Sequence, residues 1–403
     1  MPRAGWKKPV SGRRLSDLVS VGVLCRTFPP ELVDEVIAEA GRTEQRHRSL
    51  PARAMAYFAI GMALHSEGSY EDVLGLLTDG LSWSTGEGEP VKLPSKSAIF
   101  QARARLGFEP VQALFGRVAV PVATAATPGA WCGGRRLVAV DGATFDVADT
   151  VANAEWFGRP GVAKGEQSAF PQARVVALAE CATHVMFDAV VGKYSTAENT
   201  MAAELFERLE PNMLVLADRG FCGYPLWNKA QATGADLLWR ANSTMKPRHA
   251  ETLSDGSWLG ELRPSHGPGR DAAALKIRVI DYTIDDGRQS DDTYRLFTTI
   301  LDPADVSATD LAVAYNQRWE IEGTFDELKT HQRGPRTVLR SKAPALVLQE
   351  IWGHLCCHYA IRTLMCEAAA HANIDPDRVS FVAALRIARR SVAQTRAFSP
   401  SGH

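Results

Sequence analysis

An alternation of strand and helix patterns in the middle of the chain limits the possible folds most strongly. Three β-rich segments come first: RLVAVDGATFDV, ARVVALAEC and HVMFDAVVGKYS. An amphipathic helix pattern, AENTMAAELFERL, carries Glu198 in its first turn, and the apolar strand pattern NMLVLADRGF then leads into Asp218. Because fold class follows from the order in which strands and helices alternate, this region predicts an α/β domain.

The order of three strands, a helix and a strand is the one with which a ribonuclease H-like (retroviral integrase-like) core begins. We expect the first part of this core at 134–222 and a β-rich insertion at 223–305. In the insertion, DLLWRAN, ALKIRVIDYTI and TYRLFTTI predict strands, and DDGRQSDD predicts a turn between two of them. A long helix, which Ser307 or Thr309 would cap, is expected within 306–345 and completes the core, and further helices are expected at 346–403.

The segment 1–126 is predicted to be an all-α N-terminal domain. FPPELVDEVIAEAG, LPARAMAYFAIGMALHSEG and SYEDVLGLLTDGL have helical patterns, and KSAIFQARARLG begins a further helix that Ser95 would cap. The stretch around this last helix carries four positive charges and no acid: Lys92, Lys96, Arg103 and Arg105. A short helix, a loop and a basic helix indicate a helix-turn-helix-like DNA-binding unit, although a basic surface helix is the alternative. ATPGAWCGGRR, from Ala126 to Arg136, is interpreted as a linker to the core.

Composition limits the class of protein. A chain of 403 residues predicts two or three domains, and a formal net charge of -1 means that any DNA contact must rest on local patches. The apolar run MAYFAIGMALH is too short to span a bilayer, no signal peptide is evident, and the seven cysteines form no CxxC pair. These features favour a cytoplasmic protein with reduced thiols. The cluster HLCCH is better explained by helix packing than by zinc, because no second ligand pair lies at the usual spacing.

Three acids stand out. Asp141 ends the apolar run LVAVD and Asp218 ends LVLAD, and an acid after residues that prefer burial is costly unless it is paired, hydrogen-bonded or bound to a metal. If the two strands are neighbours, both carboxylates lie at one edge of the sheet. The predicted long helix contains YNQRWEIEGTFDELKTHQRG, whose spacing would place four side chains on one side of a helix: Tyr315, Arg318, Glu322 and Lys329. A solvated helix face explains this helix alone, but it does not explain the two strand acids.

Two Asp and one Glu that converge offer hard oxygen ligands for Mg²⁺ or Mn²⁺. Two such ions support phosphoryl transfer by activating the attacking oxygen and stabilising the leaving oxygen. In that setting Arg318 and Lys329 would hold phosphate, and Tyr315 would donate a hydrogen bond.

At these residues the chain resembles the insertion-sequence DDE transposases of the insertion sequence four group. Their Y-x2-R-x3-E-x6-K signature is met in full by the four helix residues named above. VDGATFDVADTVANAEWFGRPG and ADRGFCGY resemble the two Asp blocks of the family, and SAIFQARARLG resembles part of its N-terminal domain. The resemblance implies a catalytic, metal-binding triad of Asp141, Asp218 and Glu322, with two Mg²⁺ or Mn²⁺ ions. It further implies cleavage at terminal inverted repeats, attack of a 3′-hydroxyl on target DNA, and a homodimer in the DNA complex. The protein would then associate with the bacterial nucleoid when it is bound to DNA.

Some relatives flip a base onto a Trp, which makes Trp319 a candidate DNA contact, together with Trp239 and Trp258; core packing is the favoured interpretation of each. Some relatives also carry a second Asp directly after the first, where this chain has Gly142. The nearby acids Asp146 and Asp149 are interpreted as lying outside the metal ligands, since Asp146 is in odd register with Asp141.

Two other functional classes compete with an active transposase. A decayed or repurposed, non-catalytic DNA-binding protein would bind element ends without cutting them. A host nuclease on the same fold would cut DNA without specificity for such ends. The intact triad argues against the first alternative, and the N-terminal domain and the full signature argue against the second.

Overall fold

The computed structural model describes residues 23–44, 50–82, 94–161, 168–264, 274–283, 293–334 and 337–392. The chain forms two compact units: unit 1 contains 1–120, 145–173 and 326–403, and unit 2 contains 121–144 and 174–325. The unit boundaries cut across the predicted segments, because the expected catalytic helix region is divided between Phe325 and Asp326. Compactness depends on which residues pack together, and neighbours in the sequence need not do so.

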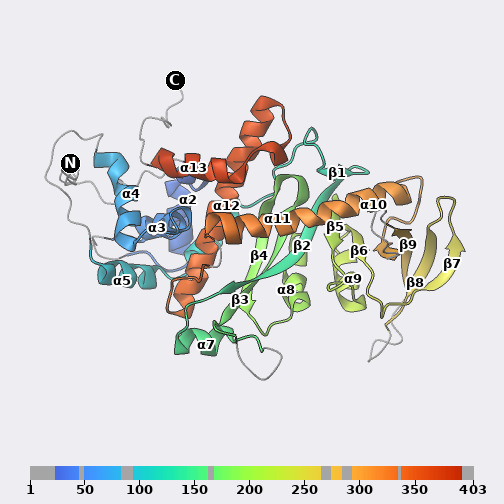
Figure 1. Cartoon of the computed structure of the whole chain (residues 1–403), viewed down its shortest axis with the longest axis horizontal. Helices are drawn as coiled ribbons and strands as arrows, with labels where there is room; N and C mark the ends of the chain where they lie inside the picture. Colours follow the sequence, from blue (N-terminus) through green and yellow to red (C-terminus); the bar gives the residue numbers. More distant parts are fainter. Residues whose placement is uncertain are drawn as a thin grey trace. The chain divides into compact units, whose positions relative to one another are not determined.

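Unit 2 is built on a sheet with the strand order β4-β3-β2-β5-β6-β10-β9-β8-β7, and β1 pairs with β2 at its side (Figure 1). In chain order the strands are β1 (Trp131–Cys132), β2 (Arg135–Asp146), β3 (Gln172–Glu180), β4 (Val185–Lys193), β5 (Met213–Ala217), β6 (Asp236–Arg240), β7 (Arg248–Thr252), β8 (Trp258–Leu262), β9 (Leu275–Thr283) and β10 (Thr293–Thr298). Strand β5 pairs in parallel with both β2 and β6, and all five of its residues are buried, as expected for a central strand. The predicted α/β, ribonuclease H-like core is confirmed.

The β-rich region extends this sheet. Strand β10 pairs antiparallel with β6, and β9, β8 and β7 follow as successive antiparallel neighbours. The three predicted strands correspond to β6, β9 and β10, whereas the predicted DDGRQSDD turn lies outside the described residues. Sequence patterns missed β7 and β8; all five residues of β7 are exposed, so it has no buried alternation to detect.

Half of the predicted linker is instead a hairpin. β1 pairs antiparallel with the start of β2, with Cys132 opposite Arg135. The two intervening residues, Gly133 and Gly134, have φ values of 53° and 75°, which suit a tight hairpin turn that other residues adopt with strain. The Gly-Gly pair that suggested a flexible linker therefore makes a turn.

The helices of unit 2 are α8 (Glu198–Leu205), α9 (Tyr224–Gln231), α10 (Ala308–Asn316) and α11 (Glu320–Asp326), the last of which ends one residue inside unit 1. Ser307, one of the two predicted caps, accepts a hydrogen bond from the amide of Asp310 and begins α10. A 3₁₀ turn at Gln317–Trp319 joins α10 to α11, and α10 packs against β6 and β9. The predicted long helix is therefore present, with α10 followed by α11 (Figure 1), but its winding changes along its length.

Unit 1 is mainly helical. Its helices are α1 (Val23–Thr27), α2 (Pro30–Glu39), α3 (Ala52–Leu64), α4 (Tyr70–Ser82), α5 (Lys96–Leu106), α6 (Glu109–Val118), α7 (Val151–Phe157), α12 (Pro344–Ala372) and α13 (Phe381–Val392). The long α12 packs against α3, α6 and α13. A Cβ at Gly353 would lie 2.5 Å from the carbonyl oxygen of Ala59, so glycine permits the close approach of α12 and α3. None of the described helices combines the length and apolarity needed to cross a membrane.

The HLCCH cluster belongs to the core of α12. His354, Cys356, Cys357 and His358 are all buried there. The Nε2 atom of His358 lies 3.1 Å from a carboxylate oxygen of Glu327. This arrangement agrees with the predicted helix packing.

Helix α5 confirms the basic helix but corrects one of its predicted DNA contacts. The hydroxyl of Ser95 caps it by accepting from the amide of Ala98, and Lys96 and Arg105 are exposed. Arg103 is fully buried, so the prediction that it contacts DNA is wrong. Helical periodicity turns Arg103 toward the core while Arg105 faces solvent. Lys92 lies outside the described residues.

The buried guanidinium of Arg103 joins α4, α5 and α12. It donates to the side-chain oxygen of Gln349 at 2.8 Å, to the hydroxyl of Tyr70 at 2.6 Å and to the hydroxyl of Ser341 at 3.2 Å. We expect Arg103→Met to lower the free energy of unfolding by about 2 kcal/mol, because it removes charged hydrogen bonds and leaves buried polar groups without a partner. Arg105→Met, on the exposed face of the same helix, should change it by less than about 0.5 kcal/mol. Urea denaturation measures both, and equal effects would contradict the structural role of Arg103.

Candidate active site

Two of the predicted acids are neighbours in the sheet, although β2 continues beyond Asp141 to Asp146 and only Asp218 follows the end of its strand. Strands β2 and β5 pair in parallel, and Val140 stands opposite Ala217. Asp141 and Asp218 are the next residues on the two strands, so they follow a paired position on neighbouring chains. The juxtaposition expected from the sequence is therefore present, and it depends on the direct pairing of β2 with β5.

Tyr315 fastens α10 to the end of β5. Its side chain is buried, and its hydroxyl donates a hydrogen bond of 3.2 Å to the carbonyl oxygen of Ala217, the residue before Asp218. Burial raises the pKa of the Tyr315 phenol, so the group remains a neutral donor. The predicted contact of Tyr315 with DNA phosphate does not fit this arrangement, because the hydroxyl is already used inside the protein.

Arg318 links two of the acids. Its Nη2 atom donates to Oε1 of Glu322 at 3.0 Å, and its Nη1 atom lies 3.7 Å from Oδ2 of Asp141. The side chain of Arg318 is only 6% exposed, whereas that of Glu322 is 47% exposed. In this state Arg318 holds the carboxylates together and does not present a surface for phosphate, contrary to its predicted role.

Asp141 has an unfavourable setting for a charged carboxylate. The pKa of Asp141 is raised from 3.8 to about 6, mainly by burial and in smaller part by the carboxylates of Glu322 and Glu198. The amide of Gly142, which donates to Asp141 at 2.7 Å, and the Arg318 guanidinium lower this pKa and offset part of the effect. The site without a cation therefore disfavours the charged form of Asp141, mainly because the carboxylate is buried.

Glu198 is the residue at this site that sequence patterns missed. A Cβ placed on Gly142 would lie 3.0 Å from the Glu198 carboxylate, which explains why a residue without a side chain follows Asp141. Arg174 lies 3.7 Å from the same carboxylate and stacks over the ring of Tyr194. The position of Glu198 in the first turn of α8 was evident from the sequence, but its proximity to Gly142 on β2 was not.

The donor set suits a hard divalent cation. Asp141, Asp218 and Glu322 offer carboxylate oxygens, which Mg²⁺ and Mn²⁺ prefer. The raised pKa of Asp141 reflects above all its burial, which disfavours the charged carboxylate and which a bound cation would offset. The chemistry of these residues therefore suits a metal ion, while among the described residues these three acids do not form a group whose ligand atoms all lie within 4.8 Å of one another.

Lys329 is described with unit 1, unlike the other three residues of the signature. It lies in a π-helical segment, Glu327–Gln332, and its Nζ atom is 5.8 Å from the centre of the Phe145 ring. Burial lowers the pKa of Lys329, as does the nearby Arg333. The π-helical segment and the 3₁₀ turn change the number of residues per turn, so the expected single α-helical face is not confirmed.

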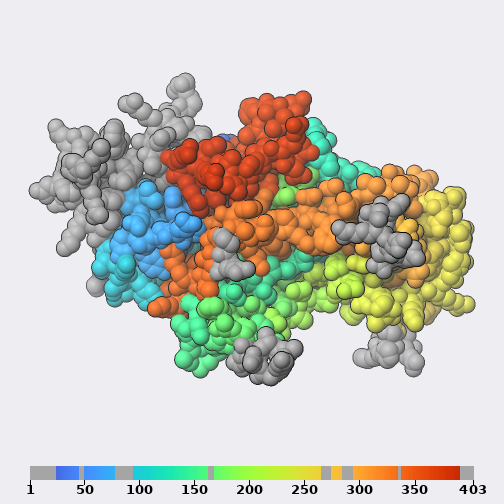
Figure 2. Space-filling view, viewed as in Figure 1, coloured from blue at the N-terminus to red at the C-terminus, as the bar shows by residue number. Residues whose placement is uncertain are grey.

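The tryptophans differ in their environments. Trp319 is 54% exposed, so the favoured interpretation of core packing is wrong for it. The Cζ atom of Arg318 lies 4.3 Å from the centre of the Trp319 ring, and the helical segment that carries it lies at the surface (Figure 2, orange). Trp239 is fully buried, as predicted, while Trp258 is partly exposed and packs beside His249.

Asp146 and Asp149 have partners of their own. The amide nitrogen of the Gln172 side chain donates to Asp146 at 2.8 Å, and Asp149 forms an ion pair with Arg159. Both residues are described with unit 1, whereas the proposed triad lies in unit 2. These contacts agree with the expectation that neither is a metal ligand.

Comparisons with known proteins agree with this geometry. Residues 18–116 match the family model of the insertion element 4 transposase N-terminal domain, and residues 133–360 match that of the transposase DDE domain. The transposase InsG for insertion sequence element IS4 of Escherichia coli (strain K12) is 29% identical over 374 residues, covering 92% of this chain and 83% of InsG. The putative transposase InsZ of the same strain is 27% identical over 227 residues, covering 55% of this chain and 71% of InsZ.

A solved structure of the piggyBac transposase synaptic complex with hairpin DNA covers 92% of this chain and 79% of that chain. Its sequence identity is 12% and its TM-score is 0.47, a likeness too weak to inform the function of this chain.

Neighbouring parallel strands that lead to Asp141 and Asp218, together with a match to the transposase DDE domain over more than half of the chain, define a DNA transposase. The chain belongs to the insertion element 4 family of DDE transposases. Membership of this family implies dependence on divalent metal ions and DNA as the partner.

Proposed function

We propose that this transposase binds the terminal inverted repeats of its insertion element and performs metal-dependent DNA cleavage and strand transfer. One observation carries the proposal. Asp141 and Asp218 follow paired residues of parallel strands, and Arg318 joins Asp141 to Glu322. Carboxylates at adjacent positions of neighbouring strands repel one another, and metal-assisted phosphoryl transfer explains why they stand there.

The proposed roles follow from the contacts. Asp141, Asp218 and Glu322 would hold two Mg²⁺ or Mn²⁺ ions, which supply an activated attacking oxygen and stabilise the leaving oxygen when bound. Arg318 orients Glu322 toward Asp141, and Tyr315 fixes the backbone that precedes Asp218. Glu198, held by Arg174, adds negative charge next to Gly142 and so strengthens the attraction of the site for cations.

The test is cleavage of DNA that carries the inverted repeats flanking the gene. We expect cuts at the repeat ends with Mg²⁺ or Mn²⁺, none in EDTA, and joining of the released 3′ ends to a target. Binding of these ends without any cleavage would indicate a repurposed DNA-binding protein. Cleavage without preference for the ends would indicate a nuclease. Either result would overturn the proposal.

DNA contacts are proposed for Lys96 and Arg105 on α5, for Lys329 and for Trp319. The first two are exposed on a basic helix, and Lys329 is half-buried beside Phe145.

In the DNA complex we propose two protomers, each of which holds one element end. Because it binds DNA, the protein would be located at the bacterial nucleoid. Sedimentation of the protein with and without end DNA measures the stoichiometry, and a complex with one protomer would contradict the dimer.

We expect Trp319→Ala to weaken the binding of element ends with an unpaired base at the cut site by about tenfold, the loss typical of one base–aromatic stack. Val313→Ala provides a matched control, because Val313 is also exposed and lies on the preceding helix α10. Fluorescence anisotropy with fully paired and unpaired ends separates the effects. Equal losses for both DNAs would show that Trp319 does not support a base.

A further inference from the structure

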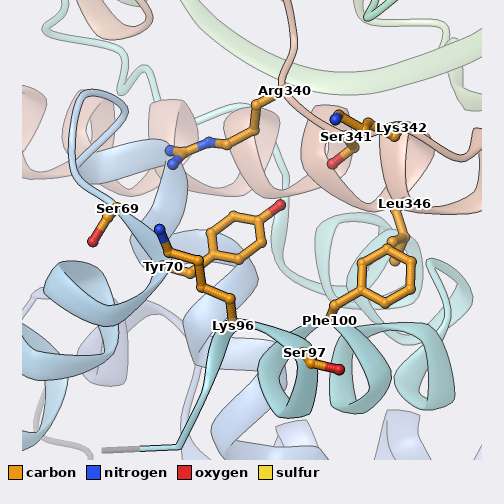
Figure 3. Close-up of a pocket in the computed structure, with 9 residues that line it drawn as sticks. All are labelled: Ser69, Tyr70, Lys96, Ser97, Phe100, Arg340, Ser341, Lys342 and Leu346. Atoms are coloured by element: carbon orange, nitrogen blue, oxygen red, sulfur yellow. The ribbon is translucent and has the colours of Figure 1, made fainter. Parts of the chain in front are cut away.

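Unit 1 contains a cavity whose lining includes none of the acids described above. It has a volume of about 500 Å³ and lies between the start of α4, helix α5 and the segment that leads into α12. Figure 3 shows Lys96 and Phe100 rising from α5 on one side and Arg340, Ser341 and Lys342 on the other. This volume falls in the range of about 300–1,000 Å³ that is usual for small-ligand sites.

The cavity carries an excess of positive charge. Arg340 is fixed in its wall, because its guanidinium donates to the carbonyl oxygens of Gly68 at 2.6 Å and Ser66 at 3.0 Å. Lys96 is 72% exposed and lies 3.9 Å from Glu71, a distance at which an exposed ion pair contributes little. The charges at and behind the wall are those of Lys96, Arg103, Arg340 and Lys342 against those of Glu71, Asp72 and Glu350. An anion would balance this excess.

The buried Arg103 prepares two hydroxyls as donors. The hydroxyl oxygens of Tyr70 and Ser341 each accept a hydrogen bond from its guanidinium, at 2.6 Å and 3.2 Å. Because an oxygen that accepts from a cation keeps its own proton for another partner, both hydroxyls are set to donate to an acceptor in the cavity. Neither hydroxyl is hydrogen-bonded to Glu350, whose two carboxylate oxygens accept from the backbone amides of Arg340 and Ser341.

The rim adds an apolar ring. Phe100 is 44% exposed, although it stands beside these cations, and the side chain of Leu346 lines the same cavity. A simple anion such as phosphate cannot stack on an exposed aromatic ring, whereas a nucleotide presents a phosphate and a flat base together. Base–aromatic stacking with a basic groove is the usual chemistry of single-stranded nucleic-acid sites.

We propose that this cavity binds one unpaired deoxynucleotide of DNA. Its phosphate would lie against Lys96, Lys342 and the hydroxyls of Tyr70 and Ser341, and its base would stack on Phe100. The proposal rests on DNA as the substrate of the proposed function, but it requires no catalysis and involves none of the acids of unit 2.

The experiment uses the full chain and a short fluorescein-labelled oligothymidylate, with a blunt duplex as the second probe. Phe100→Ala is expected to weaken binding of the single strand about tenfold, with a much smaller effect on the duplex. Phe100→Leu, which keeps apolar bulk without a ring, should give an intermediate loss. Gln101→Ala is the matched exposed control on α5 and should bind as the parent does. Equal effects of Phe100→Ala on both probes, or no effect, would overturn the proposal.

The lysines are tested by the salt dependence of binding. The double variant Lys96→Ala/Lys342→Ala should reduce the slope of log K against log salt for the single strand by about 0.7, the change expected when one phosphate charge is no longer neutralised. Lys229→Ala/Lys276→Ala removes two exposed lysines of unit 2 and should leave the slope unchanged. Equal reductions by the two double variants would indicate non-specific attraction and overturn the site.

Competition distinguishes a nucleotide from a simple anion. Thymidine monophosphate should displace the oligothymidylate, whereas inorganic phosphate at the same concentration should not. Equal displacement by phosphate would overturn the nucleotide assignment.

Cleavage of element ends, measured in parallel, distinguishes a failure of the nucleotide site from a failure of the proposed transposase function. A parent protein that cuts DNA while Phe100→Ala binds normally would refute only the cavity, and one that binds the oligonucleotide without cutting would refute only the proposed function.

Discussion

Glu322→Gln is expected to reduce the rate of metal-dependent cleavage at an element end by about three orders of magnitude. Glutamine has the size of the native side chain and can still accept a hydrogen bond from Arg318, which lies 3.0 Å from Glu322. It lacks the charge that a divalent cation needs, and such a cation contributes several kcal/mol to phosphoryl transfer, at about 1.4 kcal/mol for each tenfold in rate. Binding of the end should be retained, because the substitution removes a negative charge that repels DNA.

Glu320→Gln is the matched control. Glu320 lies two residues earlier in α11, and its carboxylate pairs with Nε2 of His184 at 2.7 Å. Cleavage by this variant should be close to that of the parent. Loss of cleavage in both variants would indicate a general effect on the helix, and cleavage by Glu322→Gln at the parental rate would exclude Glu322 from the triad.

Asp141→Asn is expected to abolish cleavage to a similar extent and, at the same time, to stabilise the metal-free protein. Burial raises the pKa of Asp141 from 3.8 to about 6, and the side chain is only 22% exposed. An acid whose pKa rises on folding binds its proton more tightly in the folded state, so stability falls as the pH rises from about 4 to about 6. At neutral pH, the neutral amide should therefore raise the free energy of unfolding by about 1–3 kcal/mol.

Thermal denaturation in EDTA as a function of pH measures this effect. The advantage of Asp141→Asn should be absent at pH values below the unfolded pKa of 3.8 and complete above about 6. Mg²⁺ should then stabilise the parent more than the variant, because a ligand that binds the folded state raises stability by mass action. Glu251→Gln, on the exposed strand β7, should melt like the parent throughout. If Asp141→Asn is no more stable than the parent at neutral pH, the fold does not disfavour the charged carboxylate of Asp141.

The proposed triad was accessible to sequence reasoning because its signals are local. Asp141 and Asp218 each follow an apolar strand, and Glu322 belongs to a short motif with fixed spacing. The alternation of strands with a helix also predicted the core and the parallel neighbours that bring the two Asp residues together. Each of these features is a pattern within a short stretch of the sequence, so it can be found without knowing which distant residues are in contact.

The roles of the surrounding residues were less predictable because helical spacing does not reveal burial. Arg103 and Arg105 are two residues apart on one basic helix, yet the first is buried and the second is exposed. Tyr315 and Arg318 were expected to face DNA, but they hydrogen-bond within the protein, to Ala217 and Glu322. Trp319 was expected in the core and is exposed.

By itself, the sequence determined the α/β core, the three acids and the family, since local polarity patterns and motif spacing carry that information. Only the tertiary structure decided that Glu198 lies beside Gly142, that Arg318 bridges Asp141 and Glu322, and that β7–β10 extend the core sheet. Each of these facts depends on residues distant in the chain. Their contacts are set by how whole elements pack, and no local pattern of residues specifies that packing.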